Sequence, residues 1–111
     1  MTVYRIECWD CKNKGEAAVY IGQSRRPVRI RFNEHLGDAR FRRPDTGLGE
    51  HTLAFHPEMD NTAINSNFSI EILATKHHEA DLRICESILI REQNPSMNTM
   101  SRSWSLTKHV I

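Results

Sequence analysis

The fold is decided by Val19-Tyr20-Ile21-Gly22, which is followed after eight residues by Arg31-Phe32-Asn33-Glu34-His35. The first block is aromatic and β-branched and stops at a glycine, which predicts a short strand ending in a turn. The second block lies in a segment, from Val28 to Ala39, where apolar residues recur at helical spacing. On such a helix Arg31 and His35 are one turn apart on one face. A guanidinium and an imidazole placed in this way can hold a phosphate and exchange a proton, although similar pairs are common on surfaces without function.

The chain has 111 residues, of which 39% are hydrophobic, and this is enough for one compact domain with a modest core. Its apolar runs are far shorter than the roughly 18 residues that cross a bilayer, and residues 1–7 lack the apolar core of a secretory signal. The three cysteines are an odd count, which argues against a disulfide framework. We therefore expect an intracellular protein, cytoplasmic or nuclear, that does not bind membranes.

Residues 3–7 and 17–21 are predicted to pair as a hairpin around a polar loop. Residues 68–72 alternate between apolar and polar side chains and are predicted to form a third strand with one solvated face. Residues 57–67 are polar and are predicted to form a loop. The tail from Ser96 onward is predicted to be irregular, with Trp104 as its one large anchor.

A first helix is predicted over residues 27–40, with Ser24 as its candidate cap. A second, short helix is predicted to begin at a cap formed by Asp45 or Thr46 and to turn Phe55 inward. Together with the strands, these helices predict an α/β chain of the α+β class.

The predicted first helix and the residues around it form a strongly basic segment. Between positions 25 and 43 there are seven arginines against two acidic residues, a local charge of +5 in a chain whose net charge is +1. The arginines are Arg25, Arg26, Arg29, Arg31, Arg40, Arg42 and Arg43. Guanidinium groups match phosphate oxygens, so a polyanion is the natural partner. The alternative is a solvated, arginine-rich helix face.

A third helix is predicted over residues 78–92, and Glu86 lies inside its apolar arc. The arc is formed by Leu82, Cys85, Leu89 and Ile90. A carboxylate at such a position is costly to bury unless it is paired, hydrogen-bonded or bound to a cation. A metal ion and a structural ion pair with Arg31 both satisfy this requirement, and the sequence leaves the two open.

Tyr4 and Tyr20 fall on adjacent strands of the predicted hairpin. Aromatic residues on strands most often fill half-buried positions. The alternative is that the two phenols face a shared cleft, and their position in the fold decides between these interpretations.

Five separated elements together resemble the GIY-YIG nuclease domain. They are Thr2-Val3-Tyr4, Val19-Tyr20-Ile21-Gly22, Arg31 through His35, Glu86 and Asn98. The similarity covers about residues 2–99 and includes the twelve-residue step from Glu86 to Asn98. The first motif is degenerate, with Thr2 and Val3 in place of Gly and Ile. The lysine often found just after the second motif is replaced by Gln23, and Arg25 or Arg26 is the candidate for its role.

The resemblance implies a small three-stranded antiparallel sheet flanked by helices, a nuclease domain over residues 1–99 with a zinc-binding insertion, and a C-terminal tail over 100–111. It implies one catalytic divalent metal, magnesium or manganese, bound by Glu86. The residues implied to line the cleft are Tyr4, Tyr20, Arg31, His35 and Asn98. The implied reaction is metal-dependent hydrolysis of phosphodiester bonds in DNA. In it a tyrosine or His35 activates water, and Arg31 and the metal stabilise the developing charge.

DNA is accordingly the expected partner, contacted by a set of arginines outside the cleft. These are Arg25, Arg26, Arg29, Arg40, Arg42 and Arg43. Sequence preference is not encoded by any motif here, because readout depends on groove contacts and DNA shape. Specificity is therefore expected to reside in a fused targeting domain, in a homodimer mate or nowhere.

Cys8 and Cys11 form a Cys-x-x-Cys pair, and His51 and His56 are five residues apart. Two thiolates and two imidazoles suit tetrahedral zinc, so the sequence predicts a structural zinc site, with unliganded surface residues as the alternative. The Cys pair also lengthens the step between Tyr4 and Tyr20 to sixteen residues. This insertion resembles the GIY-YIG variant that accompanies Penelope-like retroelements, which also contains a Cys-Cys and a His-His pair.

Two other functions remain open from the sequence. One is a catalytically silent, zinc-stabilised nucleic-acid-binding module that keeps the fold without turnover. The other is a thiol redox protein that uses Cys8 and Cys11. It would need a thiol with a lowered pKa at an exposed helix start, and this pair is expected in a hairpin loop instead.

Overall fold

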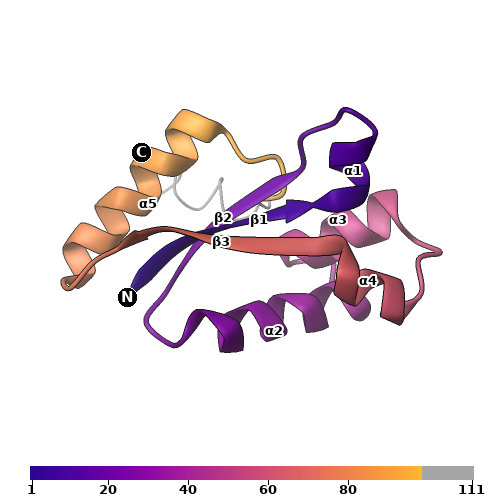
Figure 1. Ribbon diagram of the computed structural model, residues 1–111, viewed down its shortest axis with the longest axis horizontal. Helices are drawn as coiled ribbons and strands as arrows, with labels where there is room; N and C mark the ends of the chain where they lie inside the picture. Colours follow the sequence, from indigo (N-terminus) through magenta and orange to yellow (C-terminus); the bar gives the residue numbers. More distant parts are fainter. Residues whose placement is uncertain (99–111) are drawn as a thin grey trace.

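A central strand with a helical layer on each side organises the molecule (Figure 1). The computed structural model describes residues 1–98. β1 (Thr2–Cys8) pairs antiparallel with β2 (Val19–Ser24) on one side and with β3 (Phe68–Thr75) on the other. The helices of the described part are α1 (Trp9–Asn13), α2 (Val28–Arg40), α3 (Gly47–Phe55), α4 (Asn61–Asn67) and α5 (Glu79–Gln93). The predicted α+β class with a three-stranded antiparallel sheet is confirmed.

Side chains alternate along β1 and divide the core into two clusters. Tyr4, Ile6 and Cys8 face the layer that contains α2 and α3, and each is fully buried. Val3 faces the opposite way and packs with Leu82 of α5. Figure 1 shows α2 and α5 on opposite sides of the sheet. Full burial of a side chain of this size contributes about 1.5–3 kcal/mol, so both faces of the sheet are covered by stabilising contacts.

The predicted helix starts are only partly confirmed. Thr46 caps α3, because its side chain accepts a hydrogen bond from the Gly49 N–H. Ser24 does not cap α2, which starts after Pro27; its hydroxyl instead donates to the Arg26 carbonyl and accepts from the Arg26 N–H. Pro27 is itself the N-cap residue, and α2 has no side-chain cap hydrogen bond.

Two short helices occupy segments predicted as loops. α1 forms one turn inside the hairpin connection and buries Cys11. α4 begins at Asp60, whose side chain accepts from the Ala63 N–H, and it buries Ile64. Phe55 was expected inward but is 64% exposed at the end of α3. These differences arise because one or two helical turns carry too few apolar positions to show a period in the sequence.

The remaining predicted segments agree with the structure or lie outside it. β3 runs to Thr75, three residues beyond the predicted strand end. α5 ends at Gln93, and its C-cap Asn94 adopts the left-handed conformation common after helix ends. Trp104 and the boundary between residues 99 and 100 lie outside the described residues. Within residues 1–98 no helix has the length and apolar character needed to cross a bilayer.

Candidate active site and metal centre

Tyr4, Tyr20 and His35 form one cluster between the sheet and α2. The Tyr4 hydroxyl oxygen is 2.7 Å from His35 Nε2, and the two groups form a hydrogen bond. The hydroxyl donates when Nε2 carries no proton and accepts when Nε2 carries one. The Tyr20 ring stacks edge-on against the His35 ring with centroids 4.8 Å apart, and the two tyrosine rings are 6.4 Å apart. The predicted phenols therefore share one cluster with the predicted histidine.

A glycine on β2 makes room for this cluster. Gly22 pairs with Tyr4 in the strand register, and a Cβ there would lie 2.6 Å from the Tyr4 hydroxyl oxygen and 2.8 Å from the Tyr20 ring. Such distances are shorter than any ordinary contact. β2 continues to Ser24, so the glycine does not end the strand as the sequence predicts. It instead allows both tyrosine rings to lie over the strand.

The cluster is enclosed. Tyr4 is 0% exposed, His35 is 2% exposed and Tyr20 is 6% exposed. A hydroxyl bonded to an imidazole in such surroundings can pass a proton along the pair, and Tyr20 is the member closest to solvent.

Arg31 lies one turn before His35 on α2 and lines a pocket of about 380 Å3 at the end of β2. The pocket is lined by Gln23, Ser24, Arg25, Arg26, Arg31 and Leu82. Glu34 holds two of its arginines, since its carboxylate accepts two hydrogen bonds from Arg26 and one from Arg31. Each guanidinium keeps further N–H donors, so the pocket presents fixed donors to an anion.

Glu86 is buried on α5, as the apolar arc predicts, and is 7% exposed. It follows Leu82 by one helical turn, and Leu82 lines the same pocket as Arg31. α2 and α5 cover opposite faces of the sheet, so Arg31 and Leu82 approach this pocket from the two helical layers. One carboxylate together with water and phosphate oxygens fits magnesium, which retains most of its water ligands in protein sites.

Asn98 lies beside the outer edge of β2 and pairs with its backbone. Its side-chain oxygen accepts from the Ile21 N–H at 2.9 Å, and its amide nitrogen donates to the Ile21 carbonyl at 3.0 Å. The Met97 N–H adds a bond to the Val19 carbonyl. Asn98 therefore closes the β2 edge directly next to Tyr20 and Gly22.

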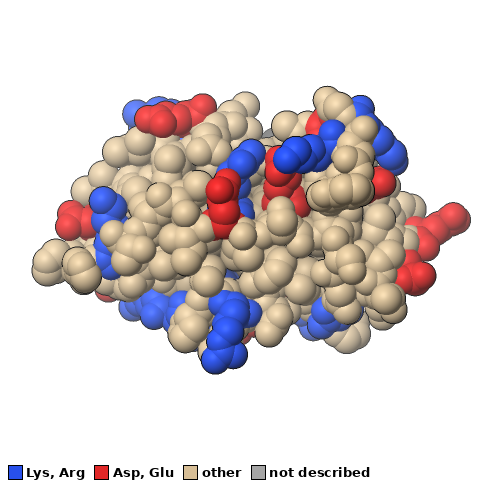
Figure 2. Space-filling view, in the orientation of Figure 1, with Lys and Arg blue, Asp and Glu red and all other residues tan. Residues whose placement is uncertain are grey.

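The predicted DNA-contacting arginines have different surroundings. Figure 2 shows basic side chains along the edge of the molecule over α2. Arg25 pairs with Glu79, Arg40 donates to Asn65 and Arg43 pairs with Asp38. Arg29 is exposed on α2.

Arg42 differs from the other arginines because its guanidinium is turned into the fold. It donates to the carbonyls of His56 at 3.2 Å and Met59 at 2.6 Å. Its backbone φ of 50° lies in the left-handed region, which an arginine rarely adopts. Arg42 thus joins the end of α2 to the chain that follows α3.

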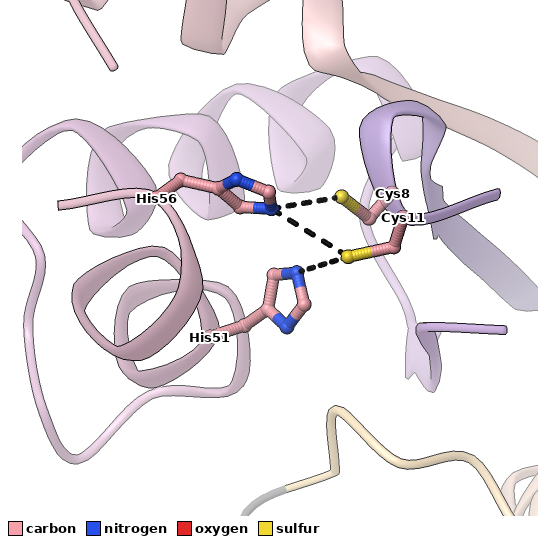
Figure 3. Close-up of side chains that lie close together, drawn as sticks. All are labelled: Cys8, Cys11, His51 and His56. Carbon is pink, nitrogen blue, oxygen red and sulfur yellow. Dashed lines mark hydrogen bonds between the residues drawn. The ribbon is translucent and has the colours of Figure 1, made fainter. Parts of the chain in front are cut away.

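Cys8, Cys11, His51 and His56 form a buried cluster that can hold a metal ion (Figure 3). Their ligand atoms all lie within 4.8 Å of one another. His56 Nε2 is 3.3 Å from Cys8 Sγ and 3.6 Å from Cys11 Sγ, and His51 Nε2 is 3.5 Å from Cys11 Sγ. Zn–S and Zn–N bonds of about 2.3 and 2.0 Å at a tetrahedral angle separate sulfur and nitrogen by about 3.5 Å. The donor set and its spacing therefore fit zinc.

Three elements supply this cluster. Cys8 ends β1, Cys11 lies in α1, His51 lies in the second turn of α3, and His56 is its C-cap. α1, which the sequence did not predict, turns the second cysteine back toward the first. The predicted grouping of the four residues is confirmed, and all four are buried instead of lying on the surface.

Two polar residues outside the ligand set contact it, and no pattern in the sequence marks them. Asp10 lies 3.5 Å from His56 Nδ1, on the far side of the ring from the sulfurs. Asn67 donates to Cys8 Sγ at 3.2 Å and accepts from the Asp10 N–H at 3.0 Å. A carboxylate behind a metal-binding histidine fixes the ring orientation and raises its basicity. No motif marks Asn67, because 59 residues separate it from Cys8.

Burial lowers the pKa values of the two histidine ligands and raises the pKa of the Cys11 thiol. It lowers the pKa of His51 to about 4, with a smaller contribution from His56. It also lowers the pKa of His56, against the opposing effect of Asp10. Burial raises the pKa of the Cys11 thiol to about 12, and its hydrogen bond with Cys8 adds to the shift. In the metal-free protein the imidazoles are ready to ligate, whereas the Cys11 thiol must lose a proton as metal binds.

Comparison of the chain with family models, with curated proteins and with solved structures finds no match.

Proposed function

We propose that this protein is a divalent-metal-dependent DNA endonuclease of the GIY-YIG type. The observation that carries the proposal is the cluster of Tyr4, Tyr20 and His35, with Arg31 one turn away in an arginine-lined pocket. These four residues come from two strands and one helix and belong to the motifs that suggest the family. A structural aromatic core would not need the histidine hydrogen bond or the adjoining arginines.

The residues have distinct roles in this proposal. Arg31 and the pocket arginines hold a DNA phosphate, with Glu34 fixing the guanidinium groups of Arg26 and Arg31. Tyr20, the phenol nearest to solvent, takes a proton from the attacking water while its own phenolic proton passes toward the His35–Tyr4 pair. The water oxygen bonds to phosphorus, the bond to the leaving sugar oxygen breaks, and that oxygen takes up a proton from solvent. A magnesium or manganese ion at Glu86 would supply stabilisation of negative charge on the phosphate.

The Cys8–Cys11–His51–His56 cluster serves as a structural zinc site in the proposed enzyme. Four protein ligands close the coordination shell, as structural sites do, and leave no position for substrate. The cluster joins β1, α1 and α3, because Cys8 ends β1, Cys11 lies in α1, and His51 and His56 belong to α3 and its C-cap. This assignment also replaces the thiol redox alternative, because burial raises the pKa of the Cys11 thiol, opposite to what a reactive thiol requires.

Nicking of supercoiled plasmid in the presence of magnesium or manganese tests the proposal. Arg31→Ala and Glu86→Gln should each lower the nicking rate by about 100-fold or more, because they remove charge stabilisation at the reacting phosphate. DNA binding in a mobility-shift assay should largely survive. Arg83→Ala is the matched control, since Arg83 is an exposed arginine on α5 that pairs with Glu79.

The enclosure of the cluster supports a second candidate, a zinc-stabilised nucleic-acid-binding module without turnover. Tyr4 and His35 are nearly inaccessible, which favours a structural hydrogen bond over a working base. Wild-type protein that binds DNA but never nicks it with either metal would establish this module and reject the endonuclease.

A further inference from the structure

The metal-binding cluster and the tyrosine cluster share one core. Tyr4 and Cys8 lie on the same face of β1, and both belong to the buried cluster that also contains Tyr20, Cys11 and Leu48. The two sites are therefore joined by packed side chains. Protein interiors of this kind transmit displacement because they are close-packed.

α3 forms the most direct connection between the two sites. At its first residue, Gly47, a Cβ would lie 2.7 Å from the Tyr20 ring and 2.5 Å from the Met97 carbonyl oxygen, so the helix start is pressed against Tyr20. One turn later His51 faces Cys11, and at the C-cap His56 faces Cys8. One short helix thus contacts Tyr20 at its start and supplies both imidazoles to the metal cluster.

α3 has little stability of its own. It has nine residues, of which Gly47 and Gly49 lack a side chain. Helices shorter than about 12 residues are marginal in isolation, and glycine weakens them further. α3 packs mainly against α2, and its two histidines form its contact with the cysteines of β1 and α1. The seating of α3 against β1 and α1 therefore depends on these metal ligands.

We propose that metal binding by Cys8, Cys11, His51 and His56 positions the Tyr20 phenol through α3, so that metal loading controls the geometry of the candidate active site. Tyr4 is the internal reference. It lies on the central strand, which is paired on both sides, and its hydrogen bond runs to α2. Loss of metal should displace Tyr20 far more than Tyr4.

The chain contains two tyrosines, so fluorotyrosine labelling gives one 19F NMR signal for each. Tyr4→Phe and Tyr20→Phe assign the two signals. Removal of zinc by a chelator should shift or broaden the Tyr20 signal and leave the Tyr4 signal within its linewidth, and added zinc should restore the spectrum. Two unmoved signals in protein shown to be zinc-free overturn the proposal. Collapse of both signals to the position of unfolded tyrosine also overturns it, because the effect is then global.

Gly47→Ala tests the connection without removing metal. The added methyl group should move the Tyr20 signal while zinc content stays at one ion per chain. Gly37→Ala is the control, since a Cβ there meets only the flexible end of Arg40 at 3.7 Å. A zinc-loaded Gly47→Ala protein with an unchanged Tyr20 signal contradicts the proposed contact.

The expected effect on the nicking rate rests on the proposed endonuclease function, whereas the expected change in the 19F spectrum does not. If wild-type protein nicks DNA, Gly47→Ala should lower the nicking rate at full zinc occupancy and Gly37→Ala should not. If wild-type protein never nicks, the endonuclease fails, and the 19F spectra still decide whether metal positions Tyr20.

Discussion

Single residues outside the ligand set should tune the metal centre. Asn67 donates to Cys8 Sγ and accepts from the Asp10 N–H, so it fixes both a ligand and the residue behind His56. Outer contacts of this type contribute about 10- to 100-fold to metal affinity. Asn67→Ala should therefore weaken zinc binding by about 10-fold or more. Competition with a chromophoric chelator measures the change.

Asn65→Ala is the matched control, because Asn65 is an exposed neighbour on α4 whose side chain accepts from Arg40. It should bind zinc like the wild type. Equal affinities of the two variants would show that the contact between Asn67 and Cys8 does not act on the metal.

The metal ligands could be predicted from the sequence, and their outer contacts could not. Cys8–Cys11 and His51–His56 are closely spaced pairs of ligand-type side chains, so they can be recognised as candidate ligands without any knowledge of the fold. Asn67 has no such signature, and only the meeting of α4 with the end of β1 brings it to Cys8. Residue chemistry can be read from sequence, whereas proximity across 59 positions cannot.

At the scale of elements, length decided what the sequence could predict. α2, α5 and the three strands each contain several apolar positions at a regular spacing, so their existence and type were predicted correctly. α1 and α4 have five and seven residues and were missed, although Asp60 before α4 is a recognisable cap. α1 brings Cys11 into contact with His51. The sequence therefore predicts which residues form the metal centre, but not how they are brought together.

α3 is also where pH should act on the metal-free protein. The folded-state pKa of His51 is about 4, against 6.5 for a free imidazole, because burial disfavours the charged form. Between about pH 4 and pH 6.5 the unfolded chain therefore binds a proton at His51, whereas the folded chain does not. Stability should be complete above about pH 6.5 and fall as the pH drops toward 4, by up to about 1.4 kcal/mol per pH unit for one group.

Urea unfolding of the metal-free protein across this pH range measures the effect. His51→Gln should flatten the dependence, although the lowered pKa of His56 acts in the same direction and retains part of it. His78→Gln is the matched control, because His78 is an exposed imidazole at the N-cap of α5. Constant stability of the metal-free wild type between pH 6.5 and 4 would contradict the burial of a neutral His51.

At the scale of the whole molecule, the arrangement of charge matters more than its sum. The net charge is +1, yet arginines gather over α2, where Figure 2 shows them along one edge. Several of them are neutralised by partners, Glu34 and Asp38 on α2 itself and Glu79 on α5. A DNA phosphate must therefore compete with these carboxylates or contact an arginine that is more open, such as Arg29.

This arrangement predicts different effects for two arginines of the same basic segment. Each phosphate contact releases condensed counterions, so Arg29→Ala should weaken DNA binding and reduce the slope of log K against log salt by about one unit. Arg42→Ala should leave that slope unchanged. It should instead lower the free energy of unfolding by about 1.5–3 kcal/mol, because the charged donor to the His56 and Met59 carbonyls is lost.

Salt titrations of DNA affinity and urea unfolding of both variants separate these effects. If Arg42→Ala changed the salt slope and kept full stability, Arg42 would be a phosphate contact and its bonds to the two carbonyls would be expendable. If Arg29→Ala left the slope unchanged, DNA would bind elsewhere than along α2. From the sequence, Arg29 and Arg42 are both predicted to contact DNA, because charge can be counted in a sequence. The direction of each side chain depends on the fold around it and cannot be counted in this way.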